Sequence, residues 1–200
     1  MLGRSFLKEG TMGKRSLVLF FAALSSVLLA TSAVQAQENA PDYAQALEKL
    51  RLYSPEDPSA RKYLGLKDKD AQFFINQIDA ELLLIEIFSM YCPHCQKHAP
   101  EANRLFEIIT GRKDLKDRLK LIGIGVGNSP FEVKIFREKY SVAFPLLDDR
   151  DSAATNALSG VLTPHYVVLR LHKGGKIDVL YSDAGGFDDA EEFLKMVLSL

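Results

Sequence analysis

The two cysteines of the 200-residue chain stand three positions apart, in the tetrad Cys92-Pro93-His94-Cys95. An apolar run from Leu82 to Phe88 precedes the tetrad, and a run this short and apolar is typical of a buried strand. Pro93 suits the first position of a helix, which would place Cys92 at the helix N-cap. The free N–H groups and the positive dipole end of a helix stabilise an anion, so a thiol placed there ionises easily. The pattern therefore predicts a reactive dithiol.

Several kinds of chemistry compete for a Cys-x-x-Cys pair, and the neighbouring residues separate them. A haem attachment site needs His directly after the second cysteine, where this chain has Gln96. A structural zinc site needs four ligands and would have to recruit His94, His98 or His165. A purely structural disulfide that closes so short a loop would constrain the unfolded chain by only about 2 kcal/mol. We therefore favour a redox-active disulfide, Cys92–Cys95, with no metal and no other cofactor.

The expected roles of the tetrad and of one upstream acid follow from their positions. Cys92, nearer the helix start and solvent, is the expected attacking thiolate, and Cys95, one turn inside, is the expected resolving thiol. His94 can add positive charge or a hydrogen bond to the Cys92 thiolate. Glu86 stands in an apolar strand, so it has either a lysine partner or a raised pKa that suits proton exchange with Cys95. The alternative for Glu86 is a salt-bridged acid on an edge strand.

Further positions resemble the thioredoxin superfamily. Glu86 lies six residues before Cys92, where these proteins keep a buried acid, and Pro100 lies eight residues after it, where they kink the active-site helix. Thr163-Pro164 precedes an apolar run and is similar to the family's cis-proline loop. The resemblance implies that Pro164 is cis and that Thr163 and Pro164 bind the substrate chain. It also implies a thioredoxin-like three-layer α/β/α sandwich with a mixed central sheet.

Two subgroups of that superfamily share features with this chain. The Cys-Pro-His-Cys tetrad resembles DsbA-type oxidants, whereas the stretch from Tyr140 to Pro145 and the secretory start resemble extracytoplasmic TlpA/ResA-type redoxins. The resemblance covers about Leu82 to Leu200. It leaves the direction of electron flow open, because the tetrad favours an oxidant and the rest of the frame favours a reductase.

The first residues read as an export signal. Lys14 and Arg15 precede an uncharged run from Ser16 to Ala33, and Val34-Gln35-Ala36 is a small-residue cleavage pattern. We expect residues 1–36 to be a signal peptide cleaved after Ala36, with an uncleaved membrane anchor as the minor alternative. Export to a periplasmic or other extracytoplasmic space would let a dithiol persist as a disulfide.

Length and charge limit the remaining possibilities. With 47% hydrophobic residues, the chain is long enough for one domain, which we place at residues 82–200, preceded by an extension at 37–81 that packs on it. Loss of residues 1–36 removes four basic residues and one acid, which changes the formal net charge from −1 to −4. That balance disfavours nucleic-acid binding. We expect a monomer.

Periodicity and capping signals predict the order of elements. In the extension we expect a helix near Tyr43–Leu50, a strand at Tyr63–Leu66 and helical spacing over Asp70–Ile78. Beyond it we expect strands and helices to alternate. The expected elements are a strand at Leu82–Phe88, a helix from Pro93 to about Thr110, a strand at Leu119–Val126, a helix starting at Asn128–Pro130, a strand at Phe144–Leu147, a small helix between Asp151 and Gly160, a hairpin of Tyr166–Leu171 with Ile177–Tyr181, and a last helix with Asp188 and Glu191 as its capping box.

These observations predict an enzyme, an exported thiol–disulfide oxidoreductase that exchanges disulfides with client proteins through Cys92 and Cys95. A further redox protein would have to restore the pair. The alternative from another class is a chaperone that holds copper or another soft metal with the same cysteines. A peroxidase is disfavoured, because the cysteine that attacks peroxide usually has no partner three residues on.

Overall fold

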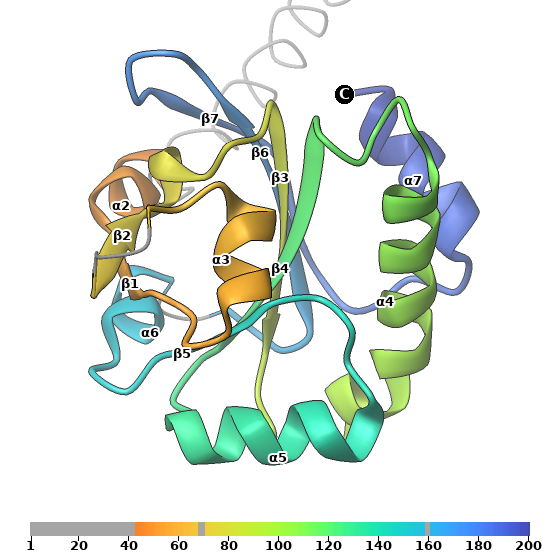
Figure 1. Ribbon diagram of the computed structural model, residues 1–200. Coiled ribbons are helices and arrows are strands. Elements are labelled where there is room, and N and C mark those ends of the chain that lie inside the picture. Colours follow the sequence, from red (N-terminus) through yellow and green to blue (C-terminus); the bar gives the residue numbers. More distant parts are fainter. Residues whose placement is uncertain (1–42, 68–70, 159–160) are drawn as a thin grey trace, which may run out of the picture. The chain divides into compact units, whose positions relative to one another are not determined.

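The computed structural model describes residues 43–67, 71–158 and 161–200, all of which lie in one compact unit (Figure 1). Its centre is β3 (Leu82–Phe88), in a five-stranded sheet with the strand order β5-β4-β3-β6-β7. β4 (Leu119–Gly125) runs parallel to β3, and β6 (His165–Leu171) runs antiparallel to it. The outer strands are β5 (Leu146–Asp148) and β7 (Ile177–Ala184). The predicted thioredoxin-like α/β sandwich with a mixed central sheet is confirmed.

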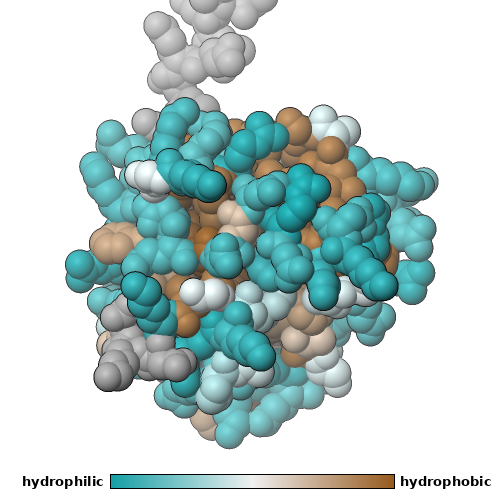
Figure 2. Space-filling view, turned by 45° about the horizontal axis from the view of Figure 1, so that its top comes forward, coloured by the Kyte–Doolittle hydropathy of each residue, from teal (hydrophilic) through white to brown (hydrophobic). Residues whose placement is uncertain are grey.

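Helices cover both faces of this sheet (Figure 1). One face is covered by α4 (Pro93–Gly111) and α7 (Ala190–Leu198), and Val133 and Phe136 of α5 (Pro130–Tyr140) join the same core. The other face is covered by α2 (Tyr43–Lys49), α3 (Pro58–Leu64) and α6 (Ala153–Ala157). On the side of the molecule shown in Figure 2, hydrophilic residues cover most of the surface.

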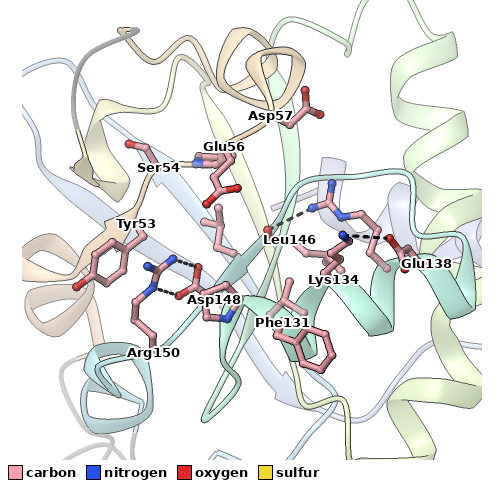
Figure 3. A pocket seen from close by; sticks show the side chains of 15 residues that line it. Tyr53, Ser54, Glu56, Asp57, Phe131, Lys134, Glu138, Leu146, Asp148 and Arg150 are labelled. Carbon is pink, nitrogen blue, oxygen red and sulfur yellow. Dashed lines mark hydrogen bonds and ion pairs between the residues drawn. The ribbon is translucent and has the colours of Figure 1, made fainter.

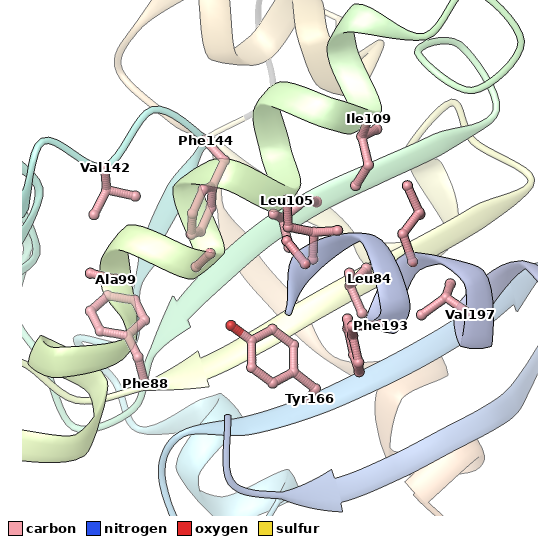
Figure 4. Close-up of a cluster of buried hydrophobic side chains, with 14 of the residues drawn as sticks. Leu84, Phe88, Ala99, Leu105, Ile109, Val142, Phe144, Tyr166, Phe193 and Val197 are labelled. Atoms are coloured by element: carbon pink, nitrogen blue, oxygen red, sulfur yellow. The ribbon is translucent and has the colours of Figure 1, made fainter. Parts of the chain in front are cut away.

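The alternation of side chains along β3 divides the interior into two clusters. Leu84 and Phe88 pack beneath α4 and α7 (Figure 4). Leu83, Ile85 and Ile87 pack on the opposite side. All five side chains are fully buried, because a central strand with helices on both faces has no side open to water.

The helix that carries the tetrad begins as predicted. Cys92 is its N-cap, with Sγ accepting from the backbone N–H of Cys95, and Pro93 is the first helical residue. The helix continues to Gly111, where the sequence predicted its end. A buried stripe of small and aliphatic side chains, which includes Ala102, Leu105 and Ile109, holds it against the sheet. This packing places the cysteines at the carboxyl end of β3.

Most of the other predicted elements are found within one or two residues. The Ser129 side chain caps α5 and forms a capping box with Glu132. β6 and β7 form the predicted antiparallel hairpin. The strand expected at Phe144–Leu147 is β5, shifted to Leu146–Asp148. The small helix is α6, and Gly160, its expected end, lies outside the described residues.

The predictions for the extension are wrong in two places. Tyr63 to Leu66 is not a strand, because Tyr63 and Leu64 are the last residues of α3. Asp57 caps the backbone N–H of Ser59 at the start of this helix, and Gly65, with φ of 71°, ends it. The stretch up to Ile78 is not a helix either. It contains a short strand, β2 (Gln72–Phe74), which pairs with β1 (Arg51–Tyr53). A 3₁₀ turn, η1 (Ile75–Gln77), follows β2.

The predicted cap of the last helix is wrong by one residue. Asp189 is the N-cap of α7, and its carboxylate accepts from the backbone N–H groups of Glu191 and Glu192 at 2.8 Å. Asp188 lies just outside the helix and is exposed. The sequence places two adjacent aspartates there, and the second, whose backbone is extended with φ of −137°, is the cap.

The proposed signal peptide, residues 1–36, and the start of the extension lie outside the described residues. Within the part of the chain that the structure does describe, no helix is long and apolar enough to cross a membrane. The boundary between an extension and a domain at residue 82 stays a prediction.

Candidate active site

Cys92 lies where β3 gives way to α4, beside the loop that precedes β6. Its thiol donates to the backbone carbonyl of Thr163 at 3.2 Å, and its Sγ accepts from the N–H of Cys95 at 3.4 Å. The peptide bond between Thr163 and Pro164 is cis. Both cysteines are free thiols, so the structure describes the dithiol form and the Cys92–Cys95 disulfide stays a prediction. The fold therefore brings together two segments that are far apart in sequence, the start of α4 and the loop before β6.

The environment of Cys92 favours its thiolate. Partial burial raises the pKa of the Cys92 thiol, but hydrogen bonds from the Thr163 side chain, from Cys95 and from the backbone N–H of His94 outweigh this and leave the pKa lowered. The backbone donors belong to the first turn of α4, whose N–H groups have no partner within the helix. Cys92 thus has the features of a nucleophile.

Cys95 has the opposite environment. Its side chain is fully buried, and burial is the main reason that the pKa of its thiol rises to about 12. The neighbouring Cys92 sulfur raises this pKa further, because two negative charges so close together repel each other. Of the two thiols, Cys92 is therefore the one that ionises more readily.

Glu86 lies on the same face of β3 as this buried sulfur. It is 2% exposed, and burial raises its pKa to about 8, while the Tyr166 hydroxyl lowers it and the Cys92 sulfur raises it. The edge-strand alternative is wrong, because β3 is the central strand. Within the described residues no ion pair forms at Glu86, and its Oε1 has no hydrogen-bond partner. The raised pKa is the alternative that the structure supports.

The sequence analysis missed Tyr166, which stands opposite Glu86 in the pairing of β3 with β6. Its side chain is 1% exposed, and burial together with the charges of Glu86 and Cys95 raises the pKa of its phenol well above 10. Figure 4 shows it within the buried cluster. Its place two residues after Pro164 was visible in the sequence, but the antiparallel register that sets it against Glu86 was not.

The three histidines near the site differ in burial. His94 is exposed. His98 is buried: its ring lies against Tyr166 and Phe187, with centroids 5.6 and 4.5 Å away, and burial lowers its pKa. His165 is also buried, and its Nε2 is 2.8 Å from Ser182 Oγ.

A groove of about 490 Å³ runs beside the cis-proline loop. Its walls are the exposed side of α4, the loop before β6 and the loop after β7, and its lining includes His94, Thr163, Pro164 and Phe187. A second cleft, of about 640 Å³, lies between α5 and residues Tyr53–Asp57 (Figure 3). That cleft has no cysteine or histidine, and Figure 3 shows charges in it paired with each other, so we assign the chemistry to the groove.

In the described ranges 43–67, 71–158 and 161–200, no group of three or more His, Cys, Asp and Glu side chains is placed to hold a metal ion. The cysteines, Thr163 and Glu86 instead form an arrangement suited to thiol chemistry. Residues 60–173 match the model of the AhpC/TSA family. The chain belongs to the AhpC/TSA family.

The relatives of this AhpC/TSA protein are thiol–disulfide oxidoreductases. The ResA proteins of Geobacillus thermodenitrificans and Geobacillus kaustophilus are each 21% identical to it over 115 residues, which are 58% of this chain and 62% of each relative. The chain thus spans less than two thirds of the length of these curated relatives.

Solved structures agree in fold. A secreted Mycobacterium tuberculosis disulfide oxidoreductase homologous to E. coli DsbE superposes with a TM-score of 0.53 at 16% identity, over 78% of this chain and 98% of that one. MTB dsbF superposes with a TM-score of 0.54 at 17% identity, over 77% and 96%. These solved structures share the thioredoxin-like arrangement of sheet and helices.

Proposed function

We propose that the protein is an exported thiol–disulfide oxidoreductase that exchanges disulfides with the cysteines of client proteins. The observation that carries the proposal is the difference between two thiols one helical turn apart: Cys92 has a lowered pKa at the start of α4, and Cys95 is buried with a pKa of about 12. Such a pair can attack with one sulfur and resolve with the other.

In the reducing direction, the Cys92 thiolate attacks one sulfur of a client disulfide. A bond forms between Cys92 and that sulfur, the client S–S bond breaks, and the second client sulfur leaves as a thiolate that takes up a proton. Cys95 then loses its proton and attacks Cys92, which releases the first client sulfur. Two electrons pass to the client, and the Cys92–Cys95 disulfide forms. Oxidation of a client dithiol is the same sequence in reverse.

Glu86 is the proposed proton acceptor for Cys95. A carboxyl with a pKa of about 8 can exchange a proton near neutral pH, which an ordinary glutamate cannot do efficiently. Tyr166 supports this assignment, because its phenol interacts electrostatically with both Glu86 and Cys95.

Thr163 and Pro164 are the proposed backbone contact for clients, beside the Cys92 sulfur. Tyr91, next to Cys92, and Leu162, next to Thr163, are exposed by 67% and 74%. Exposed apolar side chains on either side of a reactive sulfur suit contact with an unfolded client segment.

Export rests on the sequence of residues 1–36, and the proposed location is periplasmic or otherwise extracytoplasmic. The partner that restores the pair is a second dithiol or disulfide protein. The direction of electron flow is left to measurement. No observation favours the copper-handling alternative, since the described residues gather no further His, Cys, Asp or Glu donors into a group of three.

The test is reaction of residues 37–200 with insulin, a disulfide-bonded probe. The reduced wild type should cleave insulin disulfides, and Cys92→Ser should abolish cleavage. Cys95→Ser should accumulate a mixed disulfide with insulin on a non-reducing gel, because it keeps the nucleophile and loses the resolver. Insulin trapped on Cys92→Ser and not on Cys95→Ser would refute the assignment.

A further inference from the structure

The loop that presents Cys92 is held by residues outside the tetrad. The backbone of Met90, two residues before Cys92, is bonded on both sides: its N–H donates to Asn128 Oδ1 at 2.8 Å, and its carbonyl accepts from Gln96 Nε2 at 2.8 Å. Asn128 is 38 positions away in sequence, between β4 and α5. Both hydrogen-bonding groups of Met90 are thus occupied by side chains.

A third bond holds the next residue. The Tyr91 hydroxyl donates to Glu132 Oε1 in the first turn of α5. The other carboxylate oxygen of Glu132 accepts from the N–H and the hydroxyl of Ser129, at 2.6 and 2.7 Å. Glu132 therefore joins the start of α5 to the residue adjacent to the nucleophile.

Asn128 is an unusual residue for its environment. It is 1% exposed, and its Nδ2 has no hydrogen-bond partner among the described residues. A buried amide with an unpartnered donor is unfavourable and needs an explanation. Its own backbone is held in turn, since its N–H donates to Gly125 and its carbonyl accepts from Asp149. The amide is thus rigidly placed, and its one side-chain bond goes to the loop that carries Cys92.

We propose that Asn128 and Glu132 are positioning residues for the Cys92 thiolate. They hold Met90 and Tyr91 so that the sulfur stays beside the N–H of Cys95, 3.4 Å away, and beside Thr163. When the loop loosens, the thiolate loses its contact with the donating N–H of Cys95 and becomes less stable. Neither residue touches the sulfur, so both act through the loop.

The test is the pH profile of iodoacetamide labelling at Cys92 in the reduced protein, residues 37–200. For Asn128→Ala we expect the profile to move to higher pH, with labelling about fivefold slower at a pH below the midpoint, the factor expected from about one lost hydrogen bond. Tyr91→Phe, which removes only a hydroxyl, should move it in the same direction by less. Gln96→Ala removes the bond on the other side of Met90 and provides a second variant if Asn128→Ala does not fold.

Asn103→Ala is the matched control. Asn103 also ties a loop through its amide, donating to Tyr140 and accepting from Ala143, but that loop joins α5 to β5. We expect Asn103→Ala to lower the unfolding temperature and to leave the labelling profile of Cys92 unchanged.

The positioning of Cys92 by Asn128 and Glu132 does not depend on the proposed function. Only the consequence of that positioning for disulfide exchange rests on it. A wild type that labels at Cys92 but does not react with insulin would defeat the proposed function and leave the positioning intact. A folded Asn128→Ala whose labelling profile equals that of the wild type, or an equal displacement in Asn103→Ala, would overturn the positioning.

Discussion

The two faces of β3 are equally buried but chemically different. On one face Leu83, Ile85 and Ile87 belong to a buried cluster of apolar side chains. On the other face Glu86 lies between Leu84 and Phe88, under the helix that carries the cysteines. A central strand excludes water from both faces, so an acid in this position keeps its proton far above the usual pH. The first face contributes stability, and the second gives up some stability for titratable groups.

The difference between the two faces of β3 should have its largest effect on how the stability of the protein depends on pH. The pKa of Glu86 is about 8 in the folded protein against an ordinary value of 4.5. Between these values the unfolded chain binds fewer protons at Glu86, so the contribution of Glu86 to stability is greatest below pH 4.5 and falls as pH rises toward 8. The loss is about 1.4 kcal/mol per pH unit, or roughly 4 kcal/mol from pH 5 to pH 8.

The Glu86→Gln variant isolates this contribution, because an amide takes up no proton. Urea unfolding at several pH values should show that the variant lacks the fall present in the wild type. Glu81→Gln is the matched control, since Glu81 is an exposed carboxylate just before β3, and its variant should keep the wild-type slope. Parallel pH profiles for wild type and Glu86→Gln would contradict a buried acid with a raised pKa.

The apolar face should respond in stability alone. Ile85→Ala leaves a cavity at a fully buried position, and we expect a loss of about 3 kcal/mol in the free energy of unfolding, measured in urea. The pH profile of Cys92 labelling should stay that of the wild type. If Ile85→Ala displaced the pH profile of Cys92 labelling, the two faces of β3 would be coupled through the strand. The apolar face would then not act on stability alone.

The smallest expected effect is at His94. The structure assigns part of the lowered Cys92 pKa to the backbone N–H of His94, a donor that alanine retains. His94→Ala should therefore move the reduction potential of the cysteine pair to more negative values by less than about 30 mV, the change that corresponds to a tenfold shift in equilibrium. Equilibration with glutathione measures it. A larger shift would show that the imidazole controls the potential.

Local signals in the sequence predicted much of this site. The apolar run of β3, the proline after Cys92 and the turn between β6 and β7 each define a structure over a few residues, and those elements were predicted well. The strand predicted at Tyr63 was wrong because Asp57 and Pro58 start a helix, α3, that continues to Leu64. The residues near Tyr63 are compatible with either a strand or a helix when only their own types are considered.

Contacts between distant segments could not be predicted in this way. The burial of His98 depends on Phe187, and the bond from Asn128 to Met90 depends on how β4 and α5 approach the active-site loop. Tyr166 faces Glu86 only because of the register of β6 against β3. None of these leaves a periodicity or a motif in the chain, so they emerge only when the fold is known.

The most direct test of the account is the labelling of both thiols of the reduced wild type as pH is raised, followed by peptide mapping. A Cys92 pKa below its ordinary value and a Cys95 pKa of about 12 predict that iodoacetamide modifies Cys92 at a lower pH than it modifies an ordinary thiol, while Cys95 stays unmodified until the solution is strongly alkaline. Modification of Cys95 first, or of both cysteines over the same pH range, would contradict the division of the pair into nucleophile and resolving thiol.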